Sequence, residues 1–156
     1  MGALRNIKVL DLSRILAGPY STQILSDLGA EIWKVESPWG DDTRQWGPPF
    51  LNKESSYYLS ANRGKKSLII NLKSEKGQNI IKDLAKKADI LVENFKVGNL
   101  AKFGLDYKSL SEINPKLIYA SVTGFGQTGP RSSEPGYDAA LQGMTGIMSV
   151  TGEPDG

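Results

Sequence analysis

Residues 7–35 read IKVLDLSRILAGPYSTQILSDLGAEIWKV, and this stretch decides the fold because it places one helical segment between two short apolar runs. The first run, at 7–12, suits a buried strand, and Pro19 stands where a proline is tolerated in the first turn of a helix. The inner face of that helix is expected to carry Ile24, Leu25 and Leu28. Gly29 ends the helix and residues 31–35 form the next strand, so the stretch predicts a β-α-β unit.

The same alternation of strands and helices continues along the chain. Further strands are expected at residues 67–72, 90–92 and 117–122, and a short helix is expected at 107–114. Ser74 can cap a longer helix whose apolar residues recur every three or four positions, namely Ile80, Ile81, Leu84, Ala85 and Ala88. Because parallel neighbours need a crossover, the pattern predicts a Rossmann-like α/β fold with a mostly parallel sheet and helices on both faces.

In a parallel sheet, the loops that leave the carboxyl ends of the strands meet along one edge, where ligands bind. Here those loops are residues 13–18, 93–98 and 123–129. The connection at 36–58 carries Trp39 and Trp46 and is too long for a simple turn. We therefore expect that connection to be functional or to form an interface.

The composition fits one domain, which we place at residues 1–156. The chain has no cysteine, so it has no disulfide or thiolate metal site, and no histidine, the commonest general base and metal ligand. No metal is expected. No apolar run approaches the roughly 20 residues that span a bilayer, and no signal peptide precedes the first strand. We expect a cytoplasmic protein that does not contact membranes.

The basic residues are unevenly distributed. The net charge is +2, yet residues 63–108 hold eleven Lys or Arg against five acidic residues, which favours an anionic ligand. The alternative is a solvated helix face that carries Lys76, Lys82, Lys86 and Lys87. A nucleic-acid partner is not expected, because no recognition motif or stacking platform accompanies the basic residues.

The last stretch, residues 135–156, reads PGYDAALQGMTGIMSVTGEPDG and places one apolar helical run between Asp138 and Asp155. Four apolar residues share one helical face, Leu141, Met144, Ile147 and Met148. Gly143 and Gly146 leave room for another backbone, so we expect this helix to be buried. The turn after it exposes a carboxylate, although Asp-Gly pairs are also ordinary turn formers.

Residues 124–129 read GFGQTG, which is literally the GxGxxG pattern of dinucleotide-binding proteins. That pattern normally opens directly into a helix whose amino terminus faces the pyrophosphate. Here seven residues that include Pro130 and Pro135 intervene, so we do not expect a nicotinamide or flavin site.

Six segments together resemble the amino-terminal part of the class III CoA-transferases, the CaiB/BaiF type that includes formyl-CoA and carnitine CoA-transferases. They are KVLDLSRILAGPY, LGAEIWKVESPWGDDTR, NRGKKSLIINLK, ADILVENFKVGNLAKFGL, NPKLIYASVTGFGQTGP and GYDAALQGMTGIMSVTGEPDG. The wording from GDDTRQWGPPF through YYLSANRGKKS is most similar to the branch that moves CoA between succinyl-CoA and glutarate. The resemblance implies a CoA-binding α/β domain that is a fragment of a longer chain.

The resemblance also implies a reaction and a location. Asp155 falls on the family nucleophile, which would form an aspartyl anhydride and then an aspartyl-CoA thioester, without a tightly bound cofactor. The partners would be an acyl-CoA, a small carboxylic acid of the dicarboxylic type and a second copy of the chain in an interlocked homodimer. The compartment would be the cytoplasm, or the mitochondrial matrix in a eukaryote.

The residues that the resemblance assigns to CoA binding follow the strands of the predicted sheet. They are Leu16, Ala17, Ile70, Asn71, Leu72, Lys73, Asn94, Phe95, Lys96, Lys102, Thr123, Gly124, Phe125 and Gly126. The three lysines can neutralise CoA phosphates, although each taken alone would be an ordinary surface lysine.

Two departures and two alternatives accompany this hypothesis. Leu16 replaces a glutamine of formyl-transferring relatives, and Ser37 replaces an arginine that several members use near the nucleotide. An α-methylacyl-CoA racemase is disfavoured because Tyr137 precedes Asp138 where that branch has a histidine, and tyrosine is a poor base at neutral pH. A non-catalytic CoA-binding module remains open.

Overall fold

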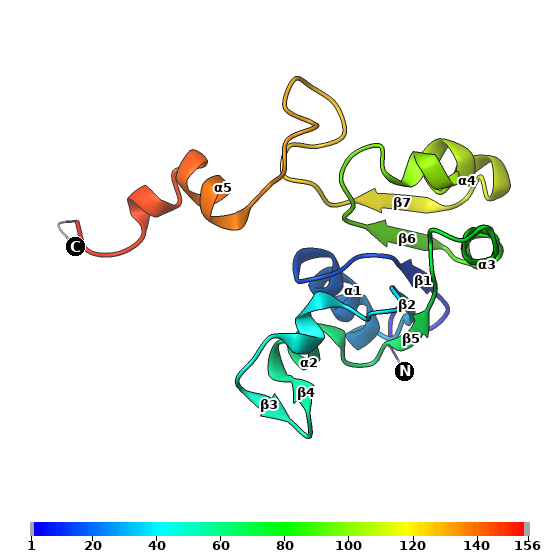
Figure 1. Ribbon diagram of the computed structural model, residues 1–156, viewed down its shortest axis with the longest axis horizontal. Coiled ribbons are helices and arrows are strands. Elements are labelled where there is room, and N and C mark those ends of the chain that lie inside the picture. Colours follow the sequence, from blue (N-terminus) through cyan, green and yellow to red (C-terminus); the bar gives the residue numbers. More distant parts are fainter. Residues whose placement is uncertain (1, 155–156) are drawn as a thin grey trace.

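The computed structural model describes residues 2–154 and consists of a parallel five-stranded sheet, helices on both of its faces, a small hairpin and an extended carboxyl-terminal arm (Figure 1). The sheet strands are β1 (Lys8–Asp11), β2 (Glu31–Glu36), β5 (Lys66–Ile69), β6 (Ile90–Glu93) and β7 (Ile118–Ser121). The helices are α1 (Ala17–Asp27), α2 (Ser56–Asn62), α3 (Glu75–Ala85), α4 (Tyr107–Ile113) and α5 (Asp138–Met144). Three 3-10 turns complete the order, η1 (Asp42–Gln45), η2 (Leu100–Phe103) and η3 (Met148–Val150).

The strand order is β5-β2-β1-β6-β7, so the first strand of the chain lies at the centre of the sheet. Val9 of β1 pairs with Ile32 of β2 on one side and with Ile90 of β6 on the other. All four ladders are parallel, and a helical crossover or a long connection joins each strand to the next one along the chain. The predicted strands and the Rossmann-like α/β arrangement are thereby confirmed.

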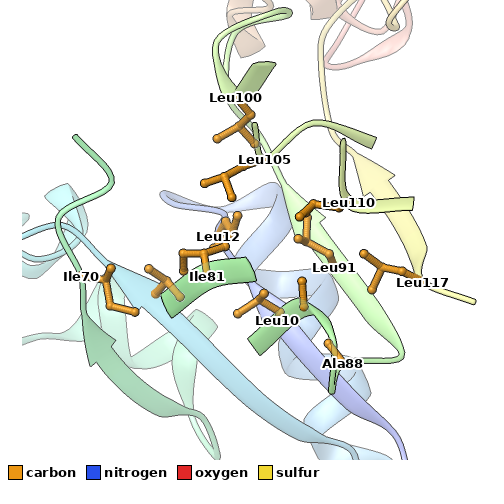
Figure 2. Packing of buried hydrophobic residues seen from close by; sticks show 12 residues of the cluster. Leu10, Leu12, Ile70, Ile81, Ala88, Leu91, Leu100, Leu105, Leu110 and Leu117 are labelled. Carbon is orange, nitrogen blue, oxygen red and sulfur yellow. The ribbon is translucent and has the colours of Figure 1, made fainter. Parts of the chain in front are cut away.

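The two faces of the sheet carry separate apolar clusters, as the two-residue period of a strand requires. Leu10 and Leu91 point to the face covered by α3 and α4, where Ile81 is fully buried (Figure 2). Val9 and Val92 point to the opposite face, where Leu25 of α1 packs against them. Helices therefore cover both faces.

Helix α3 follows the expectation closely. The Ser74 hydroxyl accepts a hydrogen bond from the Gly77 backbone N–H at 3.1 Å, which caps the helix. Ile81 and Ala85 are fully buried and Ala88 nearly so. Ile80 is partly exposed, because it lies at the margin of the buried stripe.

The expected inner face of α1 is confirmed at Leu25 and wrong at Ile24 and Leu28. Ile24 and Leu28 are 46% and 47% exposed, whereas Thr22 and Gln23 are buried. The cause is polar. The Thr22 hydroxyl donates to an Asp11 carboxylate oxygen at 2.5 Å, and the Gln23 side chain donates to the Ser60 carbonyl at 2.9 Å. These bonds fix the helix rotation and leave two apolar side chains facing outward.

The long connection after β2 contains structure of its own. It includes η1 and a hairpin of β3 (Phe50–Leu51) and β4 (Glu54–Ser55), and α2 starts directly after the hairpin. Ser55 caps α2 by accepting from the Tyr58 N–H, and its own hydroxyl donates to the Trp46 carbonyl. The hairpin and α2 therefore form one unit beside α1.

The carboxyl-terminal arm, residues 123–154, differs from the expectation of a buried closing helix. None of its residues is buried, and α5 and η3 lie away from the sheet (Figure 1). Gly146 has a φ of +81°, which ends the helical run and separates α5 from η3. Ile147 and Met148 are consequently exposed, and no second backbone approaches Gly143 within the described residues.

Two further expectations concern the GFGQTG stretch and membrane-spanning helices. Residues 123–137 are not helical, so the GFGQTG stretch does not open a helix, as its sequence context predicts. Across residues 2–154, the structure contains no helix long and apolar enough to cross a bilayer.

Candidate functional site

A cavity of about 580 Å³ opens at the carboxyl ends of β1, β2, β5 and β6, at the edge where the parallel fold predicts a ligand site. Its walls come from four segments that are far apart in the sequence. The lining residues are Leu12, Ser13, Arg14, Val35, Glu36, Ser37, Pro38, Trp39, Gly40, Asp41, Ile70, Asn71, Leu72, Lys73, Phe95 and Phe103. Apolar side chains dominate the walls, and Lys73 and Arg14 add positive charge.

The loop between β1 and α1 is held by side chains from two other strands. The Asn94 amide accepts from the Arg14 N–H at 3.0 Å and donates to the Arg14 carbonyl at 2.7 Å. The Lys34 ammonium donates to the Ser13 carbonyl at 3.0 Å. Ile15 has a φ of +71°, a conformation that is costly for a β-branched residue, and these contacts hold it there.

A buried ion pair stands behind this loop. The Lys34 ammonium lies 2.9 Å from an Asp41 carboxylate oxygen, and both side chains are only 1% exposed. Asp41 also accepts from the Thr43 N–H at 3.0 Å and from the Thr43 hydroxyl at 2.7 Å. Burial alone would raise the pKa of Asp41, but the charge and hydrogen bond of Lys34 outweigh it and lower the pKa.

A second buried carboxylate lies beside the cavity. Glu36 accepts from the Arg44 guanidinium at 2.7 and 2.8 Å, from the Ser67 hydroxyl at 2.6 Å and from the Tyr58 hydroxyl at 3.0 Å. Burial opposes ionisation, but these donors prevail and lower the pKa of Glu36 to about 2. The carboxylate is therefore ionised and fully compensated at neutral pH.

A third buried charge pair connects the sheet with α1. The Lys65 ammonium donates to Asp11 at 3.1 Å, to the Pro19 carbonyl at 2.7 Å and to the Asn62 side chain at 3.0 Å. Burial is the main reason that the pKa of Lys65 falls to about 8, although the Asp11 charge acts in the other direction. These contacts fix the first turn of α1 against the sheet.

A second cavity, of about 530 Å³, lies after β6 and β7 and shares Phe95 with the first. Its polar lining mixes both charges, with Lys96 and Lys108 near Glu93 and Asp106. The Tyr119 hydroxyl donates to the Leu105 carbonyl at 3.0 Å, and burial raises its pKa. Together the two cavities form a continuous stretch of the sheet edge on either side of one phenyl ring.

The structure brings together only part of the predicted CoA-binding set. Ile70, Asn71, Leu72, Lys73 and Phe95 line the first cavity, and Phe95 and Lys96 line the second. Asn94 instead holds the first loop, with both ends of its amide bound to Arg14.

The remaining predicted residues lie outside both cavities. Leu16 and Ala17 are exposed at the start of α1, and the Lys102 ammonium donates to the Asn99 side chain at 3.2 Å. The four residues from Thr123 to Gly126 follow β7, and the Thr123 hydroxyl is buried without a partner in the described residues. Asp155, the candidate nucleophile, lies outside the described residues.

The sequence did not predict Arg14 or the buried ion pairs, and it singled out Trp39 only as part of the connection at 36–58. One signal was available for Lys34, because in a strand it shares the face of the buried Ile32, two residues earlier. A lysine on a buried face requires a compensating anion. Among residues 2–154, no group of three or more acidic side chains is arranged to hold a metal ion.

Comparison with protein families matches residues 4–156 to CoA-transferase family III. Among curated proteins, the succinate–glutarate CoA-transferase of Agrobacterium fabrum is 53% identical over 98% of the chain, and the human succinyl-CoA:glutarate CoA-transferase is 54% identical over 98%. An acetyl-CoA:oxalate CoA-transferase from Acetobacter aceti is 48% identical. The chain spans 40%, 35% and 40% of these relatives, respectively.

Solved structures give the same result. A CAIB/BAIF family protein from Brucella suis superposes with a TM-score of 0.96 at 52% identity, over 99% of this chain and 42% of that one. The hypothetical protein Rv3272 from Mycobacterium tuberculosis superposes with a TM-score of 0.89 at 38% identity, over 100% of this chain and 43% of that one.

Proposed function

Because the chain belongs to CoA-transferase family III, we propose that it is the CoA-binding domain of an enzyme that moves CoA from an acyl-CoA thioester to a carboxylic acid. The observation that carries the proposal is the cavity at the carboxyl edge of the sheet. Five of the residues assigned to CoA by the family resemblance line it, although they come from two different strand ends. Residues from separate strand ends that together line one cavity are typical of a ligand site.

The cavity suits the two chemical parts of CoA. Its apolar walls, which include Ile70 and Phe95, can bury a heteroaromatic base, while Lys73 can neutralise a phosphate. Glu36 and Asp41 also line the cavity, but each is already paired with a cation. Their charges therefore do not oppose an anionic ligand.

We propose succinyl-CoA as donor and glutarate as acceptor. The support is that the relatives from Agrobacterium fabrum and human, both more than 50% identical, carry names with this acid pair. A relative that is 48% identical is named for oxalate, so the choice of acid depends on residues that vary within this range of identity. The racemase alternative has no supporting observation.

The proposed reaction uses an aspartate carboxylate as the nucleophile, with Asp155 as the candidate. The carboxylate attacks the thioester carbonyl, so a mixed anhydride forms and the CoA thiolate leaves. The thiolate then attacks the aspartyl carbonyl, which releases succinate and leaves an aspartyl-CoA thioester. Glutarate displaces CoA through a second anhydride, and the returning thiolate takes the glutaryl group and frees the carboxylate.

Such an anhydride hydrolyses unless water is excluded. No residue of the described arm that leads to Asp155 is buried, so this chain alone does not enclose the reacting bond. We propose that the parts of the relatives that this chain does not span, and a second copy in a homodimer, complete the enclosure.

The test is mass spectrometry of the full-length protein after incubation with succinyl-CoA, without acceptor. We expect a CoA adduct on Asp155 and glutaryl-CoA once glutarate is added. Asp155→Ala should abolish transfer but leave CoA affinity within a few-fold. An adduct on a different carboxylate would contradict the assignment of Asp155 while supporting the reaction, and the absence of glutaryl-CoA would contradict the acid pair.

A further inference from the structure

Trp39 is 88% exposed, more than any other large hydrophobic residue in residues 2–154. The other two tryptophans have partners. The Trp33 ring nitrogen donates to Glu31 at 3.0 Å, and Trp46 packs edge-on against Tyr57 with ring centroids 5.1 Å apart. Trp39 has no ring or side-chain hydrogen-bond partner in the described part of the chain. A single exposed aromatic ring is common on protein surfaces, so its position beside a cavity is the informative observation.

The exposure does not arise from a loose backbone. The Gly40 N–H donates to the Ser37 carbonyl at 2.9 Å, and the Ser37 hydroxyl donates to the Gly40 carbonyl at 2.9 Å. The Trp39 N–H donates to the same hydroxyl at 3.2 Å, and the Asp41 N–H donates to Glu36 at 2.9 Å. Four hydrogen bonds therefore fix the turn that carries the ring, so little backbone order has to be gained when a ligand binds.

The ring stands at the first cavity, which fixes the class of ligand. Trp39 lines this cavity together with the apolar side chains of Ile70, Phe95 and Phe103. Lys73 supplies a cation at the same site, and the carboxylates of the lining are already neutralised by Lys34 and Arg44. An aromatic plane, an apolar wall and an uncompensated cation together suit a flat heteroaromatic ring that carries phosphate.

We propose that Trp39 stacks on the adenine base of CoA and forms one wall of the base site. This inference rests on the proposed function. It adds a residue that contacts the nucleotide end of CoA and not the pantetheine end. The thioester reacts at the far end of the pantetheine arm, so Trp39 contributes to affinity for CoA esters and not to the chemical steps.

The experiment compares two ligands in the full-length protein by isothermal titration calorimetry. CoA carries the adenine nucleotide, and 4′-phosphopantetheine carries the same arm without it. Trp39→Ala should weaken CoA about 5- to 150-fold, the range of one lost base–aromatic stack, and leave 4′-phosphopantetheine unchanged. Trp39→Phe should recover most of the CoA affinity. In Trp39→Ala, the KM for succinyl-CoA should rise with an unchanged kcat.

Trp46→Phe is the matched control, because Trp46 packs on Tyr57 and does not line the cavity. It should leave both affinities unchanged. Equal losses for both ligands in Trp39→Ala, or no loss for either, would overturn the stacking role. A change of oligomeric mass in Trp39→Ala with unchanged CoA affinity would instead make Trp39 an assembly contact. Failure of the unmodified protein to bind CoA would overturn the proposed function itself.

Discussion

The sheet with its helices, residues 2–122, and the carboxyl-terminal arm, residues 123–154, differ in how far their side chains are buried. The first region contains two apolar clusters, two buried ion pairs and the half-buried pair of Glu36 with Arg44. In the arm no residue is buried, and its ion pair, between Arg131 and Glu134, is exposed on both sides. The sheet region is thus held by contacts between distant parts of the chain, and the arm is held by contacts within the arm itself.

The difference shows why the structure follows more directly from the sequence in the sheet region than in the arm. Each strand of the sheet meets neighbours that this chain supplies, so its side chains have defined partners. The arm is held by short-range hydrogen bonds and by one close backbone approach between Gly124 and Gly136. Substitutions in the two regions should therefore differ in the size of their effect on unfolding.

The largest effect is expected at the Lys34–Asp41 pair. Asp41→Ala leaves the Lys34 ammonium buried with only the Ser13 carbonyl, which should cost about 3–5 kcal/mol of the free energy of unfolding. Asp42→Ala is the matched control, since its partner Arg14 is 59% exposed and such pairs contribute about 0–1 kcal/mol. Urea unfolding of both variants measures the difference, and similar losses would mean that the buried pair does not support the sheet.

Acid should destabilise the sheet region through Glu36. The pKa of this carboxyl falls from 4.5 to about 2 on folding, so its contribution is complete above pH 4.5 and is lost as the pH falls toward 2. The shift corresponds to about 3 kcal/mol. Urea unfolding at pH 6, 4 and 3 should show a weaker pH dependence for Glu36→Gln than for the unmodified chain. Parallel curves would show that other carboxyls carry the acid sensitivity.

Gly124 marks the junction between the two regions. A Cβ atom there would lie 2.4 Å from the Gly136 Cα, so Gly124→Ala must separate the two backbone segments. We expect faster amide hydrogen exchange across residues 124–136, with a change in the free energy of unfolding of the sheet region below about 1 kcal/mol. Gly143→Ala is the control, because its Cβ would only touch the Met148 sulfur at 3.7 Å. A large global destabilisation would show that the arm packs on the sheet.

The smallest effect is expected at the apolar end of the arm. Met148→Ala and Val150→Ala remove exposed side chains and should change the free energy of unfolding by less than about 0.5 kcal/mol. The same substitutions in a protein of the length of the relatives give the informative comparison. A cost above about 1 kcal/mol there, but not here, would show that another segment covers the arm.

The strands and the longer helix could be predicted because their signals are local. The apolar runs of β1 and β6 are short, which favours strands, whereas the Ser74 cap followed by Ile81 and Ala85 carries the period of a helix. The position of the ligand edge followed from the parallel topology alone.

The errors have a common cause, which is that burial depends on partners distant in the sequence. Thr22 turns inward because Asp11, on the preceding strand, and Lys65, far away in the sequence, form a charged pair beneath it. Ile147 shows the reverse case, since a helical pattern predicts burial only where another element is present to cover it.

The candidate site could be predicted from the sequence only in part. Residues 70–73, which the family resemblance assigns to CoA, line the first cavity just after β5, whereas Trp39 lies in a turn whose geometry depends on Ser37 and Gly40. No periodicity marks an exposed ring on such a turn.

The order of the strands has a consequence for the emergence of the chain from the ribosome. β1 lies at the centre, β2 pairs on one side of it, β5 adds outside β2, β6 pairs on the free side of β1, and β7 adds outside β6. Every strand therefore joins an open edge of what has already been synthesised, and no completed pair has to separate to admit a later one. The sheet can grow outward in step with translation, and α1 is synthesised before Glu36, Asp41 and Lys73 of the cavity.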